Sequence, residues 1–334
     1  MTKQGKSEQK SMQAARKKRI LVIGSINMDL VLNVSSVPIS GESSLADHYW
    51  FSPGGKGANQ AAAAAQLGAD VTFVGKIGND ANGVQLLNNQ KAFGVDTSYI
   101  KTDEKASTGL AVVMVEADGK NRILIVPGSN MLLMPEDVVP VIDEGSYDAM
   151  IVQLEIPHQT VIAACRAAMN KGMPVVVDAG PAQSFPLNEI EGVTVLSPNE
   201  TETMALCGIY PDTEENAMNA ARLLLQKTKA KYIVIKRGDK GAYVYGKDIE
   251  RNIAAILVQA VDTTAAGDAF TAALTVRLIE HTSIEEAVKY ANFVGALTVT
   301  KAGAQSSLPT GMEVEKFIKD KSAMTGMDTT PTLG

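Results

Sequence analysis

One stretch, residues 261–270, places small residues, a glycine and a carboxylate directly before an apolar helical segment that continues to Ile279. The first turn of a helix leaves backbone N–H groups unpaired, and with the helix dipole they form a site for an anion such as phosphate. Asp268 lies at this helix start and could take a proton from a hydroxyl group that attacks phosphorus. Because Asp also commonly caps helices, the stretch alone leaves a catalytic base and a helix cap as equal alternatives.

A second glycine-rich stretch, residues 52–60, precedes a helix that we expect from Ala61 to Leu67. Its glycines would let the backbone approach a ligand closely, and Lys56 and Asn59 add hydrogen-bond donors beside it. Lys56 is followed by Gly57, so the stretch is not the phosphate loop of P-loop NTPases. The G-x-G-x-x-G spacing of dinucleotide-binding proteins is also absent. A flexible turn without a ligand is the alternative.

Polar residues follow the buried strand predicted by the apolar run Ile20–Gly24. Asn27 and Asp29 are two residues apart, so in an extended chain they face the same side. One side chain donates and accepts hydrogen bonds and the other only accepts, a combination that suits sugar hydroxyl groups. Ordinary turn chemistry of Asn and Asp is the alternative.

Further acids, amides and glycines follow later strands. A strand over 150–155 ends on Glu155. Asn199 and Glu202, three residues apart at a helix start, could hold magnesium through water or could form a helix N-cap. Lys236, with the glycines at 238 and 241, could bind a nucleotide phosphate or ribose, or could belong to a hairpin turn.

These residues are positioned by a regular alternation of strands and helices. Apolar runs predict strands at 71–75, 150–155, 174–178, 193–197 and 231–236, and helical patterns predict helices at 82–92, 158–170 and 214–229. Such repetition with right-handed crossovers predicts one mostly parallel sheet that is covered on both faces. Ligands of such sheets bind at the carboxyl ends of the strands, where the polar residues gather.

A small second sheet is predicted apart from this alternation. The runs 111–115 and 122–126, separated by polar residues, indicate a β-hairpin. Together with 31–34 and 48–51 they would form a lid beside the crevice. Its open face would expose apolar side chains, which a partner tends to cover. The side chains concerned are Trp50, Val113 and Ile123.

Composition limits the classes of function that the chain can have. The 334 residues can bury one large core, and a net charge of −6 argues against a general nucleic-acid binder. No run of about 18 apolar residues occurs, so no membrane span is expected. Residues 1–19 are polar and basic and are expected to be a disordered tail, with a transit peptide as the alternative. Cys165 and Cys207 lie singly, which fits a reducing cytoplasm, and the three histidines lack the spacing of a zinc site.

Five motifs in this order resemble the ribokinase-like carbohydrate kinases, the PfkB family. They are G-S-I-N-M-D at 24–29, G-G-K-G-A-N-Q at 54–60, Q-L-E at 153–155, P-N-E-T-E at 198–202 and D-T-T-A-A-G-D at 262–268. The resemblance covers about residues 20 to 318. It implies an α/β fold, a ribokinase-like three-layer sandwich with a mostly parallel central sheet and a small β-sheet lid. The kinase domain would span 20–320, with the lid at about 31–51 and 108–127, and 321–334 would be a flexible tail.

The resemblance implies ATP-dependent phosphorylation of D-ribose at O5, giving D-ribose 5-phosphate and ADP. Asp268 would be the base, and the amides of Ala266 and Gly267 would form the anion hole. The implied sugar-binding residues are Asn27, Asp29, Gly55, Lys56, Gly57, Asn59, Glu155 and Asp268. The implied ATP-binding residues are Asn199, Lys236, Gly238, Gly241, Gly267 and Asn292, with Glu202 placing magnesium through water. A sister sugar or nucleoside kinase, and a sugar-binding relative without catalysis, are the alternatives.

A potassium site is also implied, because a loop of small residues at 298–307 and Asp262 offer oxygen ligands, which suit hard cations. The resemblance puts the ion among Asp262, Thr264, Thr298, Lys301, Gly303 and Ser307. An acid that only stabilises its turn is the alternative reading of Asp262. Thr264 stands where an aliphatic residue is common in the family. Ribokinases pair their lids across a two-fold axis, so the resemblance also implies a homodimer.

Overall fold

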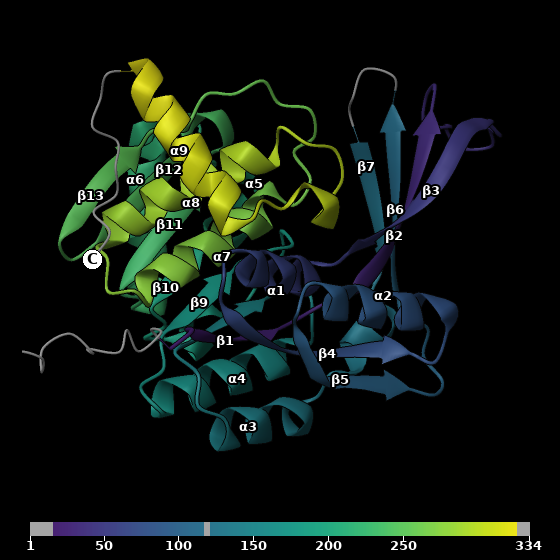
Figure 1. The fold of residues 1–334 in the computed structure, drawn as a ribbon, viewed down its shortest axis with the longest axis horizontal. Coiled ribbons are helices and arrows are strands. Elements are labelled where there is room, and N and C mark those ends of the chain that lie inside the picture. The colour runs from purple at the N-terminus through teal and green to yellow at the C-terminus, as the bar shows by residue number, and fades with distance from the viewer. Residues whose placement is uncertain (1–15, 117–120, 326–334) are drawn as a thin grey trace, which may run out of the picture.

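The larger of two sheets forms the middle of the molecule in the computed structural model, which describes residues 16–116 and 121–325 (Figure 1). From edge to edge its strands are β13 (Ile249–Ile253), β12 (Ala242–Gly246), β11 (Tyr232–Lys236), β10 (Val195–Ser197), β9 (Val175–Asp178), β8 (Ala149–Gln153), β1 (Arg19–Ile23), β4 (Asp70–Gly78) and β5 (Asp96–Asp103). Neighbouring strands are parallel except in the β11–β12–β13 meander, which is antiparallel. The predicted mostly parallel sheet is confirmed.

Helices cover both faces of this sheet. One face carries α1 (Lys56–Gln66), α2 (Ala81–Ala92), α7 (Ala266–Leu278), α8 (Ile284–Thr298) and α9 (Gly311–Thr325), and the other carries α3 (Pro135–Glu144), α4 (His158–Asn170), α5 (Glu200–Cys207) and α6 (Glu214–Thr228). Figure 1 shows α1 and α2 on one side of β1 and β4, and α3 and α4 on the other. Within β1, Ile20 and Val22 pack into one core while Leu21 and Ile23 pack into the other, because side chains alternate along a strand. The three-layer sandwich is therefore confirmed.

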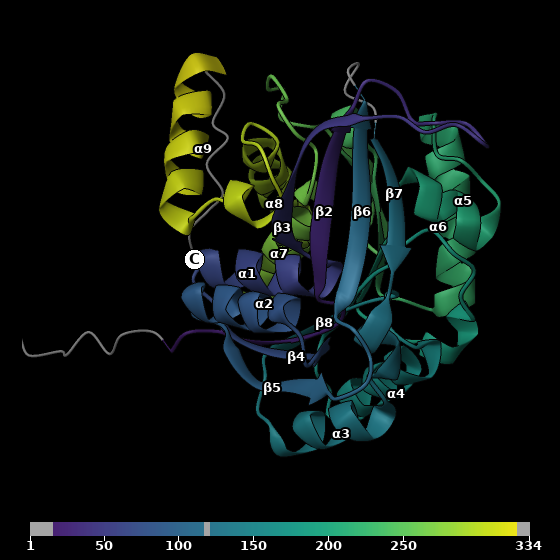
Figure 2. The same ribbon diagram turned by 90° about the vertical axis from the view of Figure 1, so that its right-hand side faces the viewer.

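The small sheet has the strand order β3–β2–β6–β7, with β2 (Asn27–Val34), β3 (Ala46–Gly54), β6 (Gly109–Glu116) and β7 (Asn121–Val126). Strand β2 runs antiparallel to β3 and parallel to β6, and β6 is antiparallel to β7. Figure 1 shows this lid standing to one side of the helices of the larger sheet, and Figure 2 views the lid strands from that side. The predicted lid segments are confirmed as strands, while residues 117–120 of the predicted hairpin turn lie outside the described residues.

Two predicted boundaries near the crevice are wrong. Strand β2 begins at Asn27 rather than at residue 31, so the two polar residues of the crevice open the lid strand. Helix α1 begins at Lys56 rather than at Ala61. Gly55 has a φ of 92°, a conformation that favours glycine, and its carbonyl accepts from the amide of Asn59 at 2.8 Å. This turn starts the helix inside the glycine-rich stretch.

The ends of the chain also differ from expectation. Most of the predicted N-terminal tail, residues 1–15, lies outside the described residues, and Arg19 already opens β1. At the other end α9 continues to Thr325, beyond the expected boundary at 320. Its ring at Phe317 packs edge-on against Phe293, and Lys321 Nζ donates to the carbonyl of Leu257 at 2.8 Å. No helix among the described residues is both long and apolar enough to cross a membrane.

Short 3-10 turns complete the described chain. They are η1 (Gly128–Leu132), η2 (Leu187–Ile190), η3 (Gly238–Lys240) and η4 (Gln305–Ser307). Three of them follow strand β7, strand β11 and helix α8, at the end of the sheet where the polar residues gather. Short turns between regular elements therefore contribute to the candidate site together with helices and strands.

Candidate active site

The start of α7 leaves one of the two expected backbone donors without a partner among the described residues. Ala265 precedes the helix in the left-handed conformation with a φ of 60°, which costs a non-glycine residue roughly 1–2 kcal/mol. The amide of Ala266 donates to the carbonyl of Thr263 at 3.3 Å. Within the described residues no backbone carbonyl accepts from the amide of Gly267. Of the two expected anion-hole donors, only Gly267 is therefore free in this structure.

Asp268 lies in the first turn of α7 and is buried, with 6% of its surface exposed. Its carboxylate accepts from Asn59 Nδ2 at 2.8 Å and from Gln60 Nε2 at 3.1 Å, both on α1. No side chain caps α7, so the helix-cap alternative for Asp268 is wrong. Burial raises the pKa of this carboxyl group, Lys56 opposes the rise and Asp178 adds to it. A buried carboxylate with a raised pKa is suited to accept a proton.

A second buried carboxylate, Asp178 at the end of β9, was not among the predicted site residues. It accepts from Lys236 Nζ at 3.0 Å, from Thr271 Oγ1 at 2.9 Å and from Gln60 Nε2 at 3.0 Å. Burial alone would raise its pKa, but the charges of Lys236 and Lys56 overcome that effect and lower it. Asp178 is therefore held as an anion beneath the predicted ATP-binding lysine.

Lys56 joins the two sides of the site. Its Nζ lies 3.7 Å from Glu202 Oε1, and its backbone amide lies 3.5 Å from Glu155 Oε2. Burial would lower the pKa of its ammonium group, but the surrounding acids raise it well above the ordinary value. Those acids are Asp178, Asp268, Glu202 and Glu155. The lysine is thus a fixed positive charge among carboxylates.

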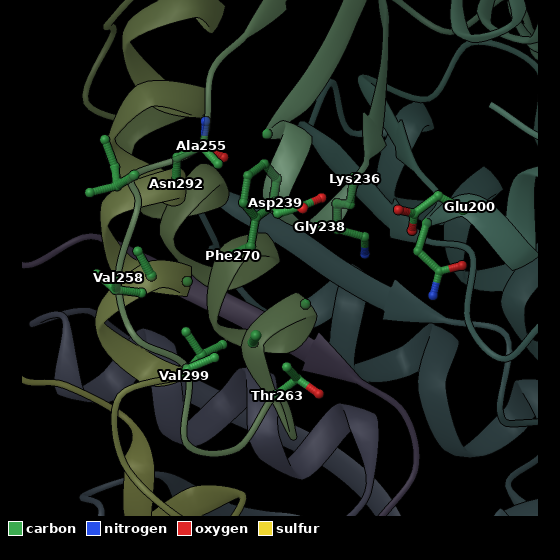
Figure 3. Close-up of a pocket in the computed structure, with 18 of the residues that line it drawn as sticks. Glu200, Lys236, Gly238, Asp239, Ala255, Val258, Thr263, Phe270, Asn292 and Val299 are labelled. Atoms are coloured by element: carbon green, nitrogen blue, oxygen red, sulfur yellow. The ribbon is translucent and has the colours of Figure 1, made fainter. Parts of the chain in front are cut away.

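A cavity of about 530 Å³ opens beside the start of α7 (Figure 3). All six residues predicted to bind ATP line it: Asn199, Lys236, Gly238, Gly241, Gly267 and Asn292. In Figure 3 Val258, Val299 and Phe270 offer apolar surface, while Lys236 and Glu200 lie on the opposite side. An apolar wall facing charged groups fits a molecule with a flat ring system at one end and negative charge at the other.

Asn292 shapes one wall of the cavity from α8. Its Nδ2 donates to the carbonyls of Ile253 at 3.3 Å and Ala254 at 2.9 Å. These bonds hold the segment that follows β13 against α8. Gly238 and Gly241 lie in the turn between β11 and β12, as the hairpin-turn alternative predicts. Both glycines also line the cavity, so the two interpretations are compatible.

Asn199 and Glu202 form the start of α5. Each side chain accepts from the backbone amide of the other residue, at 2.7 Å and 2.8 Å, which is a capping box. The N-cap alternative therefore holds, and both residues also line the cavity. Burial raises the pKa of Glu202, while Lys236 lowers it. Among the described residues, no three His, Cys, Asp or Glu side chains are grouped as metal ligands would be. Glu202, with Glu200 and Asp239 also on the cavity, fits magnesium, which proteins often bind with one or two carboxylates and substrate phosphates.

The other side of the crevice holds Asn27, Asp29 and Glu155. Asn27 Nδ2 lies 3.5 Å from Glu155 Oε2, and Ser25 Oγ donates to the same carboxylate oxygen. Burial raises the pKa of Asp29 to about 7, and the nearby charges of Glu155 and Asp268 add to the rise. Asn27 and Asp29 belong to strand β2, so the turn alternative is wrong.

The sequence did not predict one further residue of this crevice, Asn130, which lies in η1 after the lid. Its Nδ2 donates to Asn27 Oδ1 at 2.7 Å, and its Oδ1 accepts from the amide of Ile26 at 2.9 Å. Asn27 therefore presents its amide N–H groups away from Asn130. Gly57 lies against this strand connection, since a Cβ there would come within 2.8 Å of backbone atoms of Ser25.

The two segments of the expected potassium site are in contact. Asp262 accepts from the amide of Thr264 at 2.9 Å and from the amide of Gly303 at 2.8 Å. Thr298 and Ser307 are fully buried, with hydroxyl groups that donate to backbone carbonyls. Lys301 directs its Nζ to Glu313 at 2.8 Å. The carboxylate of Asp262 thus links the turn before α7 to the loop after α8.

The chain is similar in sequence and in structure to known proteins. The model of the pfkB family of carbohydrate kinases matches residues 17–311. Ribokinase of Haemophilus influenzae is 37% identical over 91% of this chain and 99% of its own length. Deoxyribokinase of Salmonella typhimurium is 35% identical over 89% of this chain and 97% of its own length. The structure of Arabidopsis thaliana ribokinase with ribose and ATP superposes with a TM-score of 0.82 and 34% identity, covering 90% of this chain and 99% of that one.

Proposed function

The chain belongs to the pfkB family of carbohydrate kinases, and from this premise we propose that it transfers the terminal phosphoryl group of ATP to O5 of D-ribose. The products are D-ribose 5-phosphate and ADP. One observation carries the proposal: the buried carboxylate of Asp268 lies between the polar crevice of Asn27, Asp29 and Glu155 and the cavity beside α7. Relatives named ribokinase match nearly the whole chain, which supports the choice of sugar.

Each residue of the site has a role in this reaction. Asp268 takes the proton of the attacking hydroxyl group while the free amide of Gly267 faces the phosphoryl group. Lys56 and Lys236 place positive charge beside the cavity, where it would balance the negative charge of the ATP phosphates. Magnesium bound with ATP supplies charge neutralisation of the phosphates, and Glu202 would help to hold it through water. Asn27, Asp29 and Glu155 bind and orient the sugar.

The test of catalysis is sugar-dependent release of ADP. A coupled assay with ribose, ATP and magnesium should show turnover that stops when ribose is omitted. A sugar-binding relative without catalysis would bind ribose, detected by calorimetry, and release no ADP above the background. The buried base and the open helix start favour the enzyme, because binding alone requires neither.

A deoxyribose kinase is the second candidate, favoured by the deoxyribokinase relative at 35% identity. Three polar groups, on Asn27, Asp29 and Glu155, face the sugar side, and 2-deoxyribose would leave one of them unpaired. An unpaired buried polar group costs about 1–3 kcal/mol, so we expect ribose to be preferred by roughly tenfold or more in kcat/KM. Equal values for the two sugars would move the assignment to the second candidate.

The lid supports a homodimer. Apolar side chains on one face of the lid are exposed, with Trp50 on β3 at 43% and Ile123 on β7 at 56%, and the strand register places both beside Val31 and Val113. Such a surface would be covered if two lids packed together. Light scattering at micromolar concentration should give twice the mass of the chain, and Trp50→Lys should give the mass of a monomer. A monomeric wild-type protein would contradict this part of the proposal.

Potassium is proposed as an activator, held by Asp262 and the carbonyl groups of the loop at 298–307. The contact of Asp262 with Gly303 supports a site shared by both segments. A cytoplasmic location is proposed because Cys165 and Cys207 are both unpaired thiols, which persist in reducing compartments.

A further inference from the structure

A line of buried amide side chains runs from α2 to the carboxylate of Asp268. Gln90 Nε2 donates to Gln305 Oε1 at 3.3 Å, and Gln305 Nε2 donates to Asn59 Oδ1 at 3.1 Å. Asn59 Nδ2 then donates to Asp268 Oδ2 at 2.8 Å. Gln305, Asn59 and Gln90 are at most 6% exposed. The three bonds all point in one direction, with the N–H toward Asp268.

The first amide fixes the direction of the whole line. Gln90 Nε2 also donates, at 3.2 Å, to the carbonyl of Ala58, which can only accept. Asn89 Nδ2 adds a second donor to Gln305 Oε1. Gln305 must therefore turn its NH₂ group toward Asn59. This leaves Asn59 with its oxygen occupied and its NH₂ group facing the base.

We propose that Gln305 is a positioning residue for the phosphoryl transfer. By fixing the orientation of the Asn59 amide, Gln305 keeps an N–H donor directed at the carboxylate of Asp268. The inference rests on the proposed function, in which Asp268 is the base. An N–H donor stabilises the ionised carboxylate, and it opposes the protonated form, whose O–H needs an acceptor. Without Gln305, the amide of Asn59 can rotate and accept from a protonated Asp268.

The line passes through the loop at 298–307, because Gln305 belongs to η4. The sequence implies that Asn59 binds sugar, but both of its amide atoms are engaged inside the protein. Nearby charges that also act on Asp268 are Lys56 on α1, Asp178 on β9 and Asp29 on β2. None of these charges changes when Gln305 is replaced by Met, so that variant measures the effect of the amide by itself.

The test compares pH profiles of kcat for the wild type, Gln305→Met and Gln305→Glu. Met keeps the volume without a donor. Glu can still accept from Asn89 and Gln90, but when ionised it offers Asn59 no donor. Both variants should move the acid limb of the profile to higher pH by about 0.5–1 unit, a loss of roughly three- to tenfold in kcat on that limb. Ser306→Ala, in the same turn and exposed, is the matched control and should leave the profile unchanged.

A double substitution identifies the route through Asn59. The variant Asn59→Ala should move the acid limb by itself, and adding Gln305→Met should move it no further. Additive shifts would overturn the proposal, as would an unchanged acid limb in both Gln305 variants. If Gln305→Met does not fold, the pH profile of the uncharged variant Gln305→Leu decides, because it also removes the donor without adding a charge. Full turnover by Asp268→Asn would instead contradict the proposed function, so the two failures are distinguishable.

Discussion

Two carboxylates share the floor of the crevice but have different neighbours. One amide nitrogen, Gln60 Nε2, donates to Asp178 at 3.0 Å and to Asp268 at 3.1 Å. Asp178 is also paired with the ammonium group of Lys236, 3.0 Å away. Within residues 16–116 and 121–325, the side-chain donors to the Asp268 carboxylate are the amides of Asn59 and Gln60. Burial acts on both, yet it raises the pKa of Asp268 while the lysines lower that of Asp178.

The difference separates a counter-ion from a base. A carboxylate bonded directly to a cation gives up that pair if it takes a proton, which costs free energy. A carboxylate held by neutral amides can take a proton and keep most of its contacts. The same buried environment thus gives Asp178 a lasting charge and Asp268 a proton affinity that fits catalysis. Gln60 bridges the two carboxylates through its Nε2. Gln153 orients Gln60 by donating to its Oε1 at 2.6 Å.

The largest expected effect comes from removing the base. Asp268→Asn keeps the size of the side chain but cannot accept the proton, so kcat should fall by about 10²–10⁴-fold. Binding of ribose and of ATP, measured by calorimetry, should change little. Asp178→Asn, measured in parallel, should reduce kcat less. Near wild-type kcat in Asp268→Asn would break the comparison, because the two carboxylates would then have no separate roles.

Stability should show the opposite order. Asp178→Asn leaves Lys236 buried without its counter-ion, and breaking a buried ion pair from one side costs roughly 3–5 kcal/mol. Asp268→Asn removes a carboxylate whose pKa is already raised by burial, so it should cost little or stabilise the fold. Urea unfolding of the two variants at pH 7 measures both changes. A larger loss of stability in Asp268→Asn would contradict the assignment of Asp178 as the counter-ion.

The sequence predicted one half of this comparison and missed the other. Asp268 was predicted because its local stretch, small residues before a helix, has a chemical meaning by itself. Asp178 ends an ordinary apolar strand, and its partners Gln60 and Lys236 lie 118 and 58 residues away along the chain. No local pattern marks such a contact. The predicted ATP residues all line one cavity because the ends of parallel strands must meet at one edge.

Other misses have the same physical reason. Gln305 lies 246 residues from Asn59, and Asn130 lies 103 residues from Asn27. The parallel core strands were predictable because burial on both faces gives continuous apolar runs. Edge strands β5 and β13 were not predicted, since half-exposed strands carry a mixed pattern, and the largely buried strand β12 was not predicted either. Helix α3 was missed because Pro140 lies inside it and interrupts its helical pattern.

A third carboxylate, Asp29, extends the comparison to pH. Its pKa is raised from 3.8 to about 7 in the folded protein, first by burial and then by Glu155 and Asp268. Between about pH 4 and 7 the folded chain therefore binds more protons here than the unfolded chain, so this group lowers stability as pH rises through that window. Above pH 7 the loss is complete. Asp29→Asn should abolish this part of the pH dependence and raise Tm at pH 8 by a few degrees without sugar.

The same variant should bind ribose less tightly, because the ionised carboxylate is the acceptor for sugar hydroxyl groups. A stabilised but weakly binding protein is the usual outcome when a strained functional group is removed. Thermal melts at pH 5 and pH 8 give the check, with Asn33→Ala on the same strand as the control. An equal effect of Asp29→Asn at both pH values would show that Asp29 titrates normally.

The smallest expected effect is activation by potassium. It should act on the start of α7 and on Asp268, and not on Asp178. Asp262 connects the turn before α7 to Gly303, so an ion bound there would fix the strained Ala265 conformation and the open amide of Gly267. It would also add positive potential near the phosphoryl group. Potassium should therefore raise kcat or kcat/KM several-fold over sodium or a bulky organic cation at equal ionic strength.

The variant Asp262→Ala decides whether this activation belongs to the proposed site. Its carboxylate accepts three hydrogen bonds, from the amide and hydroxyl of Thr264 and the amide of Gly303, so the two segments should separate when it is lost. The potassium response should then disappear while Asp178 keeps its ion pair with Lys236 and the protein keeps its core. Equal rates in all three salts for the wild type would remove the ion from the mechanism. A full response in Asp262→Ala would place the ion elsewhere and leave the hydrogen bonds of Asp262 as its whole role, which is the alternative of an acid that only stabilises its turn.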